Sequence, residues 1–121
     1  MPKHILVVDD EPFVLKILTR QLVAHGYVVL SATGGSDLMA KLATFKPDVI
    51  LLDVMMPGLD GIQIAEQLAR GKATAQIPII FLSALISPYQ PQDSPANPRF
   101  HYLGKPFEPE TLLKLLGRIG V

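Results

Sequence analysis

Short apolar runs alternate with amphipathic segments along almost the whole chain. The runs are rich in β-branched and aromatic residues, which favours β-strands. They occupy residues 5–8, 27–30, 49–52, 79–82 and 100–103. The segments between them repeat apolar residues at helical spacing, as at Val14, Ile17, Leu18 and Leu22. This alternation is typical of α/β domains with right-handed crossover connections.

The first, third and fourth runs are apolar at nearly every position, as expected of strands that are covered on both faces. We therefore expect a doubly wound α/β fold with a five-stranded parallel sheet. Counting strands along the chain, an order of 2-1-3-4-5 would make the first and third strands neighbours.

Helix ends are indicated by proline, aspartate and glycine. The first helix is expected to begin near Pro12 and to end at Gly26, because proline suits a first turn and glycine suits the position after a helix. The second is expected to stop before Pro47. The third is expected to begin after Asp60, and the last at Pro109.

One segment breaks the alternation. Between the fourth and fifth strands, where a fourth helix is due, prolines stand at positions 88, 91, 95 and 98. Each proline costs about 3 kcal/mol inside a helix, because it removes a backbone donor and clashes with the preceding turn. We predict that this helix is disrupted or absent and that an irregular connection replaces it.

Composition excludes several classes of function. At 121 residues, we expect residues 1–121 to form a single domain. The 11 basic and 11 acidic residues cancel, so no direct binding of nucleic acid is indicated. The absence of cysteine excludes disulfides and thiolate catalysis. Neither a signal-peptide pattern nor about 20 consecutive apolar residues occur, so we expect a cytoplasmic protein without membrane insertion.

Polar residues follow the carboxyl ends of the expected strands, where open α/β sheets bind ligands. Asp9 and Asp10 end the first strand and Asp53 ends the third. Ser83 ends the fourth, and Lys105 follows the fifth. If the first and third strands are neighbours, three carboxylates converge and repel one another unless a cation compensates. Oxygen ligands of this kind suit Mg²⁺, and a lysine supplies a compact positive charge.

Each of these residues also has a structural interpretation. Asp9 and Asp10 can belong to a helix cap, Ser83 to a turn, and Lys105 to a solvated loop. Asp53 is harder to explain in this way, because a carboxylate at the end of an apolar strand needs a partner. Five such residues at the correct strand ends favour a functional site.

The combined motifs resemble the receiver domain of bacterial two-component response regulators. They are Asp9-Asp10, LLDVMMPGLDG at 51–61, Ser83-Ala84 and YLGKPF at 102–107. The likeness covers nearly the whole chain and implies a flavodoxin-like fold, with the five parallel strands in the order 2-1-3-4-5. It also implies a phosphoacceptor signalling domain rather than an enzyme, limited to Mg²⁺-dependent self-phosphorylation and slow autodephosphorylation.

By this resemblance, Asp53 accepts a phosphoryl group from a sensor histidine kinase, a histidine phosphotransfer protein or a small phosphodonor. The change is passed to an output protein or domain that the sequence does not identify. Asp9, Asp10, Asp53 and the backbone carbonyl of Met55 would organise Mg²⁺, directly or through water.

The resemblance also implies how the phosphoryl group is held and sensed. Lys105 and Ser83 would bind its oxygens, and Tyr102 would be the aromatic residue that changes orientation. Met55 and Leu85 are apolar where other receivers often carry polar groups that help water attack. We therefore predict a long-lived acyl phosphate.

Two alternatives remain at this point. A receiver-like interaction module that no longer cycles phosphate would share the fold. A hydrolase with an aspartate nucleophile, such as a haloacid dehalogenase-like phosphatase, would place a second Asp two residues after the nucleophile. Here that position is Met55, and 121 residues leave little room for a substrate cap.

Overall fold

A central parallel sheet organises the protein. The computed structural model describes residues 3–56, 59–83, 92–93, 99–104 and 108–121. Five strands run parallel in the order β2-β1-β3-β6-β8, which confirms the predicted topology. Their bounds are β1 His4–Val8, β2 Val28–Ala32, β3 Val49–Asp53, β6 Ile79–Ser83 and β8 Phe100–Gly104.

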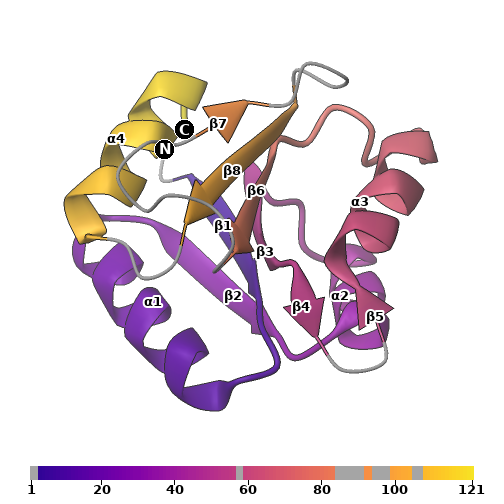
Figure 1. Ribbon diagram of the computed structural model, residues 1–121, viewed down its shortest axis with the longest axis horizontal. Coiled ribbons are helices and arrows are strands. Elements are labelled where there is room, and N and C mark those ends of the chain that lie inside the picture. The colour runs from indigo at the N-terminus through magenta and orange to yellow at the C-terminus, as the bar shows by residue number, and fades with distance from the viewer. Residues whose placement is uncertain (1–2, 57–58, 84–91, 94–98, 105–107) are drawn as a thin grey trace.

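Helices cover both faces of this sheet (Figure 1). The described residues contain α1 Pro12–Ala24, α2 Gly35–Leu42, α3 Gly61–Arg70 and α4 Pro109–Ile119. On one face, Leu18 and Leu22 of α1 and Leu115 of α4 pack against the sheet. On the other, Leu38 of α2 and Leu68 of α3 do the same. The sheet is therefore the middle of three layers, as a doubly wound fold requires.

The helix ends follow the sequence closely. Pro12 and Pro109 begin α1 and α4, as predicted. After α1, Gly26 has a φ of 91°, which an L side chain rarely adopts. The N–H groups of Gly26 and Tyr27 donate to the carbonyls of Val23 and Leu22 at 3.0 and 3.1 Å. These bonds close the helix in a Schellman motif and turn the chain into β2.

Three short strands were not predicted. Met55–Met56 (β4) pairs antiparallel with Leu59–Asp60 (β5), directly before α3 begins at Gly61. Gln92–Asp93 (β7) pairs antiparallel with Tyr102 and His101 at the edge of the main sheet. Each strand has only two residues, too few to show a period in the sequence.

The predicted loss of the fourth helix agrees with the four helices among the described residues. Between β6 and β8, the described part of the segment is strand β7 rather than helix. Residues 84–91 and 94–98, which include the four prolines, lie outside the described residues. Within the described ranges, no helix combines the length and the apolar character needed to cross a membrane.

Candidate functional site

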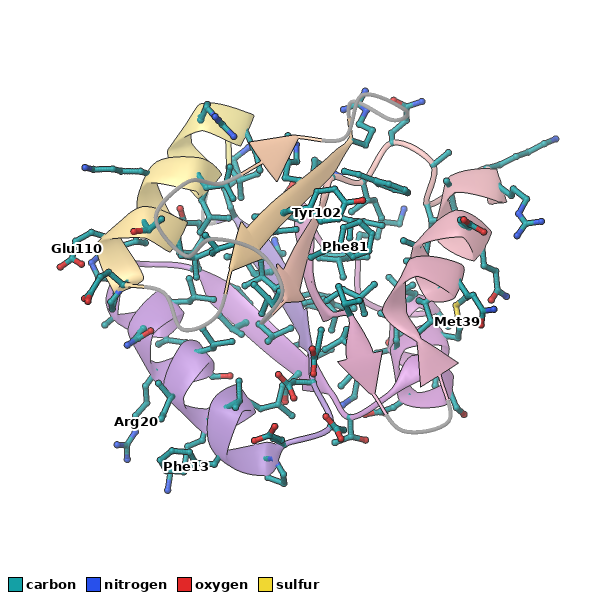
Figure 2. The ribbon with its side chains drawn as sticks, in the orientation of Figure 1. Phe13, Arg20, Met39, Phe81, Tyr102 and Glu110 are labelled. Carbon is teal, nitrogen blue, oxygen red and sulfur yellow. The ribbon has the colours of Figure 1, made fainter. Side chains whose placement is uncertain are left out.

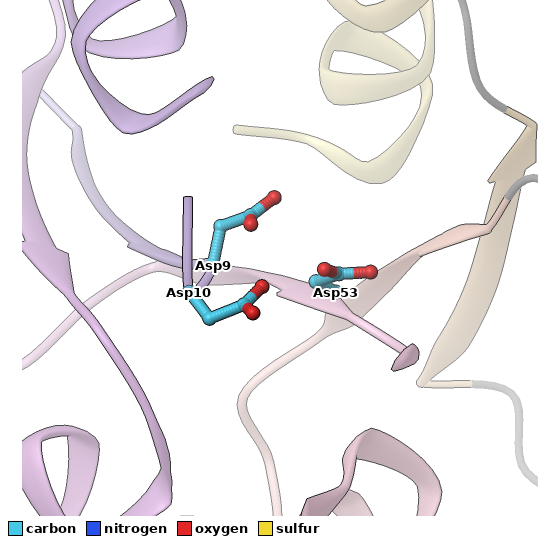
Figure 3. A group of neighbouring side chains, drawn as sticks. All are labelled: Asp9, Asp10 and Asp53. Atoms are coloured by element: carbon cyan, nitrogen blue, oxygen red, sulfur yellow. The ribbon is translucent and has the colours of Figure 1, made fainter. Parts of the chain in front are cut away.

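Three carboxylates meet where β1 and β3 end. These strands are parallel neighbours in register, with Val8 opposite Leu52, so Asp9 and Asp53 follow side by side. Carboxylate oxygens of Asp9, Asp10 and Asp53 lie within 4.8 Å of one another. Figure 3 shows the three side chains gathered beyond the strand ends. The convergence that the sequence predicted is therefore present.

Backbone groups fix the position of Asp9 in this cluster. Its side chain is fully buried, and Asp53 is 6% exposed. The N–H of Glu11 donates to Asp9 Oδ1 at 3.0 Å. The N–H of Asp9 itself donates to the carbonyl oxygen of Ala32, at the end of β2, at 3.1 Å. Asp9 is thus held from the following turn and from the neighbouring strand.

The chemistry of the cluster fits a hard divalent cation. Like charges about 5 Å apart repel by a few kcal/mol in the effective dielectric of a protein surface. A bound cation removes this repulsion, and carboxylate oxygens are the ligands that Mg²⁺ prefers. Because Asp10 is only half-buried, the cluster is open to solvent on one side. The residues present therefore suit Mg²⁺, which keeps several of its waters when bound.

The other predicted site residues are placed only in part. Ser83 and Gly104 are opposite each other where β6 and β8 end, so Lys105 follows a strand end next to that of Ser83. Lys105 itself and Leu85 lie outside the described residues, as does the side chain of Ser83. Met55 begins β4 two residues after Asp53.

Tyr102 lies in β8, beside β6 (Figure 2). Its ring stacks on that of Phe81, with centroids 4.9 Å apart and planes at 25°. Phe81 is fully buried, whereas Tyr102 is half-buried. The tyrosine therefore has one face against the core while part of it reaches solvent.

A polar network beside the cluster was not anticipated from the sequence. Asp37 Oδ2 accepts hydrogen bonds from the N–H of Thr33 at 3.0 Å and from Lys41 Nζ at 3.2 Å. The hydrogen bond from Thr33 and that from Lys41 lower the pKa of Asp37. The sequence does contain a pattern that could have indicated this network. Asp37 lies in the first turn of a helix, and Lys41 follows four residues later on the same side.

Comparison with known proteins agrees with this geometry. A family model described as the response regulator receiver domain matches residues 5–117. The chain belongs to this family. Protein PilH of Pseudomonas aeruginosa is a receiver relative that is 38% identical over 116 residues, 96% of both chains. Several other relatives are longer, and the chain spans about half of their length.

Solved receiver structures have the same fold. The chemotaxis response regulator CheY4 of Vibrio cholerae matches with a TM-score of 0.82 and 29% identity, over 98% of this chain and 99% of that one. The receiver domain of the sensor histidine kinase PA1611 from P. aeruginosa matches over the full length of both chains, with a TM-score of 0.81 and 27% identity. That structure has a magnesium ion coordinated in its active site cleft.

Proposed function

We propose that Asp53 is the phosphoacceptor of this receiver domain. The observation that carries the proposal is the set of three carboxylates within 4.8 Å, with Asp53 at the end of a buried strand. Its donor would be a phosphohistidine on a sensor histidine kinase or a histidine phosphotransfer protein. The response would pass to an output protein or domain. The absence of cysteine fits the cytoplasm, where we expect the protein to act.

The proposed reaction transfers one phosphoryl group. A carboxylate oxygen of Asp53 attacks phosphorus and forms an acyl phosphate bond. The bond from phosphorus to the donor nitrogen breaks, and that nitrogen keeps the electron pair and takes up a proton. Such transfers depend mainly on positioning the acceptor in line and on neutralising charge on the equatorial oxygens.

Asp9, Asp10, Asp53 and the backbone carbonyl of Met55 are the residues proposed to hold Mg²⁺. When bound, this ion would neutralise charge that develops on the phosphoryl oxygens. The protein positions the carboxylates. The strands hold Asp53 beside its neighbours, and the N–H of Glu11 fixes the carboxylate of Asp9.

Ser83, Lys105 and Tyr102 are proposed to detect the phosphoryl group. Its oxygens would accept hydrogen bonds from the Ser83 hydroxyl and the Lys105 ammonium group. The pairing of Ser83 with Gly104 supports this assignment, because it brings the ends of β6 and β8 together. Tyr102 would then change orientation with the β6 end, which biases an equilibrium between two surfaces.

The exposed side of α1 is the proposed contact for the phosphodonor protein. Phe13 is 71% and Ile17 is 39% exposed, and Lys16 and Arg20 lie on the same side of the helix. Helix α1 begins two residues after Asp10, so a protein that brings a phosphohistidine to Asp53 must approach its first turn. A few side chains carry most of the binding energy of a protein interface, and large aromatic side chains and arginine are enriched among them.

Labelling with a small phosphodonor and Mg²⁺ tests the proposed function. Mass spectrometry should detect one phosphoryl group on the wild type and none on Asp53→Asn. Adding a chelator should suppress the reaction. If the folded wild type is not modified by any donor, the proposal fails and the alternative of an interaction module without phosphate cycling is supported.

The predicted persistence of the acyl phosphate rests on Met55 and Leu85. Without polar side chains there, water is poorly oriented for attack. Substituting both by polar residues should speed the loss of the phosphoryl group from the isolated protein. Rapid loss from the wild type, unchanged by these substitutions, would show the prediction to be wrong.

A further inference from the structure

Two side chains of α2 hold the end of β2. Asp37 Oδ2 accepts hydrogen bonds from the N–H of Thr33 at 3.0 Å and from its hydroxyl at 3.5 Å. Lys41 Nζ donates to the carbonyl oxygen of Ser31 and to Asp37 Oδ2. Ser31 and Thr33, on either side of Ala32, are therefore hydrogen-bonded to side chains of α2. The helix itself is anchored in the core by Leu38, which is fully buried.

Ala32 connects this network to the acidic cluster. Its carbonyl oxygen accepts the N–H of Asp9 at 3.1 Å, one residue beyond the last β1–β2 pair, Val8 and Ala32. Asp9 is the most deeply buried of the three clustered acids. A shift of the β2 end would therefore be passed directly to the backbone that carries the Asp9 carboxylate.

The position of β2 explains why it needs such support. Among the described residues, it is the outermost strand of the sheet and is paired only with β1. The ends of edge strands open more readily than strands with partners on both sides. Between Ala32 and the first turn of α2 stand Thr33 and Gly34, and glycine adds backbone freedom. The bonds from Asp37 and Lys41 span this junction.

We propose that Asp37 and Lys41 are positioning residues that, through Ser31–Thr33, hold Asp9 in the geometry that binds a divalent cation. This inference rests on the proposed function, in which the acidic cluster takes Mg²⁺. The carboxylate of Asp37 is charged at neutral pH, and the hydrogen bonds from Thr33 and Lys41 hold its pKa below the ordinary value.

Substitution of Lys41 can distinguish a positioning effect on Mg²⁺ affinity from a purely electrostatic one. A positive charge near the cluster disfavours a cation, so its removal should tighten Mg²⁺ binding if charge alone matters. Positioning predicts the opposite. Lys41→Met keeps most of the side-chain stem but removes the bonds to Ser31 and Asp37. Direct hydrogen-bond partners of metal ligands are worth 10–100-fold in affinity, and we expect a loss of about 3–10-fold through this longer route.

The experiment measures the dissociation constant of Mg²⁺ by calorimetry on the full chain, for the wild type, Lys41→Met and Lys41→Arg. Arginine keeps the charge and several donors, so it should restore much of the affinity. Equal or tighter binding by Lys41→Met overturns the inference. If the wild type binds no Mg²⁺, the metal site of the proposed function fails instead, and the two failures are thus distinguished.

Asp37→Ala gives a second test that does not depend on Lys41. Hydrogen exchange at the Asp9 amide should become faster in this variant relative to amides in the centre of β3. A merely structural role would lower protection of all core amides together. Unchanged Asp9 exchange in a folded Asp37→Ala protein also counts against the inference.

Asp48→Ala is the matched control. Asp48 is also half-exposed, and it accepts a backbone N–H, that of His4, at 2.7 Å. It precedes β3, whereas Asp53 ends that strand, so it lies about 16 Å from the acidic cluster at 3.3 Å per residue. Its removal should leave both Mg²⁺ affinity and Asp9 exchange unchanged. Equal effects in both variants would mean that the response to Asp37→Ala is nonspecific.

Discussion

Asp10 illustrates how a carboxylate that is proposed to bind Mg²⁺ can cost stability. It lies with Asp9 and Asp53 in a cluster whose oxygens are within 4.8 Å, and like charges at that distance oppose folding. In metal-free protein at low salt, Asp10→Asn should raise the free energy of unfolding by about 1 kcal/mol, because one repulsive charge is lost. Urea denaturation measures this change.

Mg²⁺ should make the wild type more stable than Asp10→Asn, which reverses their order of stability. A ligand that binds only the folded state stabilises it by about 1.4 kcal/mol at ten times its dissociation constant. The wild type should gain this stabilisation, whereas Asp10→Asn should gain much less. If the substitution destabilises the protein in the absence of Mg²⁺, the acids are not in mutual repulsion.

Asp37 should make stability depend on pH in acid. Its folded-state pKa lies below the usual value of 3.8, chiefly because of the hydrogen bond from the Thr33 N–H. A lowered folded pKa means that the contribution is complete above the unfolded pKa and is lost as pH falls through the folded pKa. The stability difference between wild type and Asp37→Ala should be constant from pH 7 to about 4 and should shrink below that.

Urea denaturation at a series of pH values tests this prediction. The stability of Asp48→Ala is measured in parallel. In the wild type, the Asp48 carboxylate also accepts a backbone N–H, but at the other end of the sheet. A difference between wild type and Asp37→Ala that stays constant below pH 4 would contradict the assignment.

Alanine substitution at two glycines near helix ends should change the free energy of unfolding in opposite directions. Gly26 has a φ of 91° and no atom within 4 Å of an added Cβ, so only backbone strain opposes alanine there. Gly26→Ala should lower the free energy of unfolding by about 1 kcal/mol. Gly117 lies within α4 with equally open surroundings and no positive φ. Gly117→Ala should raise it by about 0.5–1 kcal/mol, and urea denaturation distinguishes the two.

The helix ends and the main strands could be predicted because their causes are local. Proline at Pro12 and glycine at Gly26 act through their own backbone, and fully apolar runs indicate strands that are covered on both sides. The convergence of Asp9, Asp10 and Asp53 followed once the flavodoxin-like strand order made the first and third strands neighbours. The support from Asp37 and Lys41 did not, because it depends on how α2 lies against the end of β2.

The exposed side of α1 should affect the rate of phosphoryl transfer from a protein donor but not from a small phosphodonor. Phe13 and Ile17 are exposed on α1, which begins two residues after Asp10, and Figure 2 shows Phe13 and Arg20 on the outer side of that helix. Serine at either position should slow phosphoryl transfer from a phosphorylated histidine kinase by about tenfold, which corresponds to 1.4 kcal/mol. Labelling by a small phosphodonor should not change.

Val28→Ser provides the control for the α1 prediction. Val28 is 40% exposed, similar to Ile17, but it begins β2 at the opposite end of the sheet from the acids. The kinase used should be the one in a panel that transfers fastest to the wild type. If Val28→Ser slows transfer as much as Phe13→Ser, the α1 face has no special part in docking.

The whole sheet offers a short route from the acidic cluster to the opposite edge. Asp53 pairs with Leu82 of β6, and Phe81 pairs with Tyr102 of β8. The two aromatic rings also stack. A phosphoryl group attached to Asp53, as proposed, would lie only two strands from a half-buried tyrosine. At that edge the described neighbour is the two-residue strand β7, which pairs with Tyr102 itself.

Phosphorylation should move the ring of Tyr102 and leave that of Tyr27 in place. Tyr27 packs in the other helical layer, where its hydroxyl donates to the carbonyl oxygen of Val121 at 3.2 Å. Ring resonances of both tyrosines can be followed by NMR after a small phosphodonor and Mg²⁺ are added, with Asp53→Asn as the unmodified reference. A full switch from 1:99 to 99:1 would need about 5.5 kcal/mol, so intermediate shifts are the expected result. Equal shifts at the two tyrosines would indicate a general loosening of the fold rather than a signal carried across β3, β6 and β8.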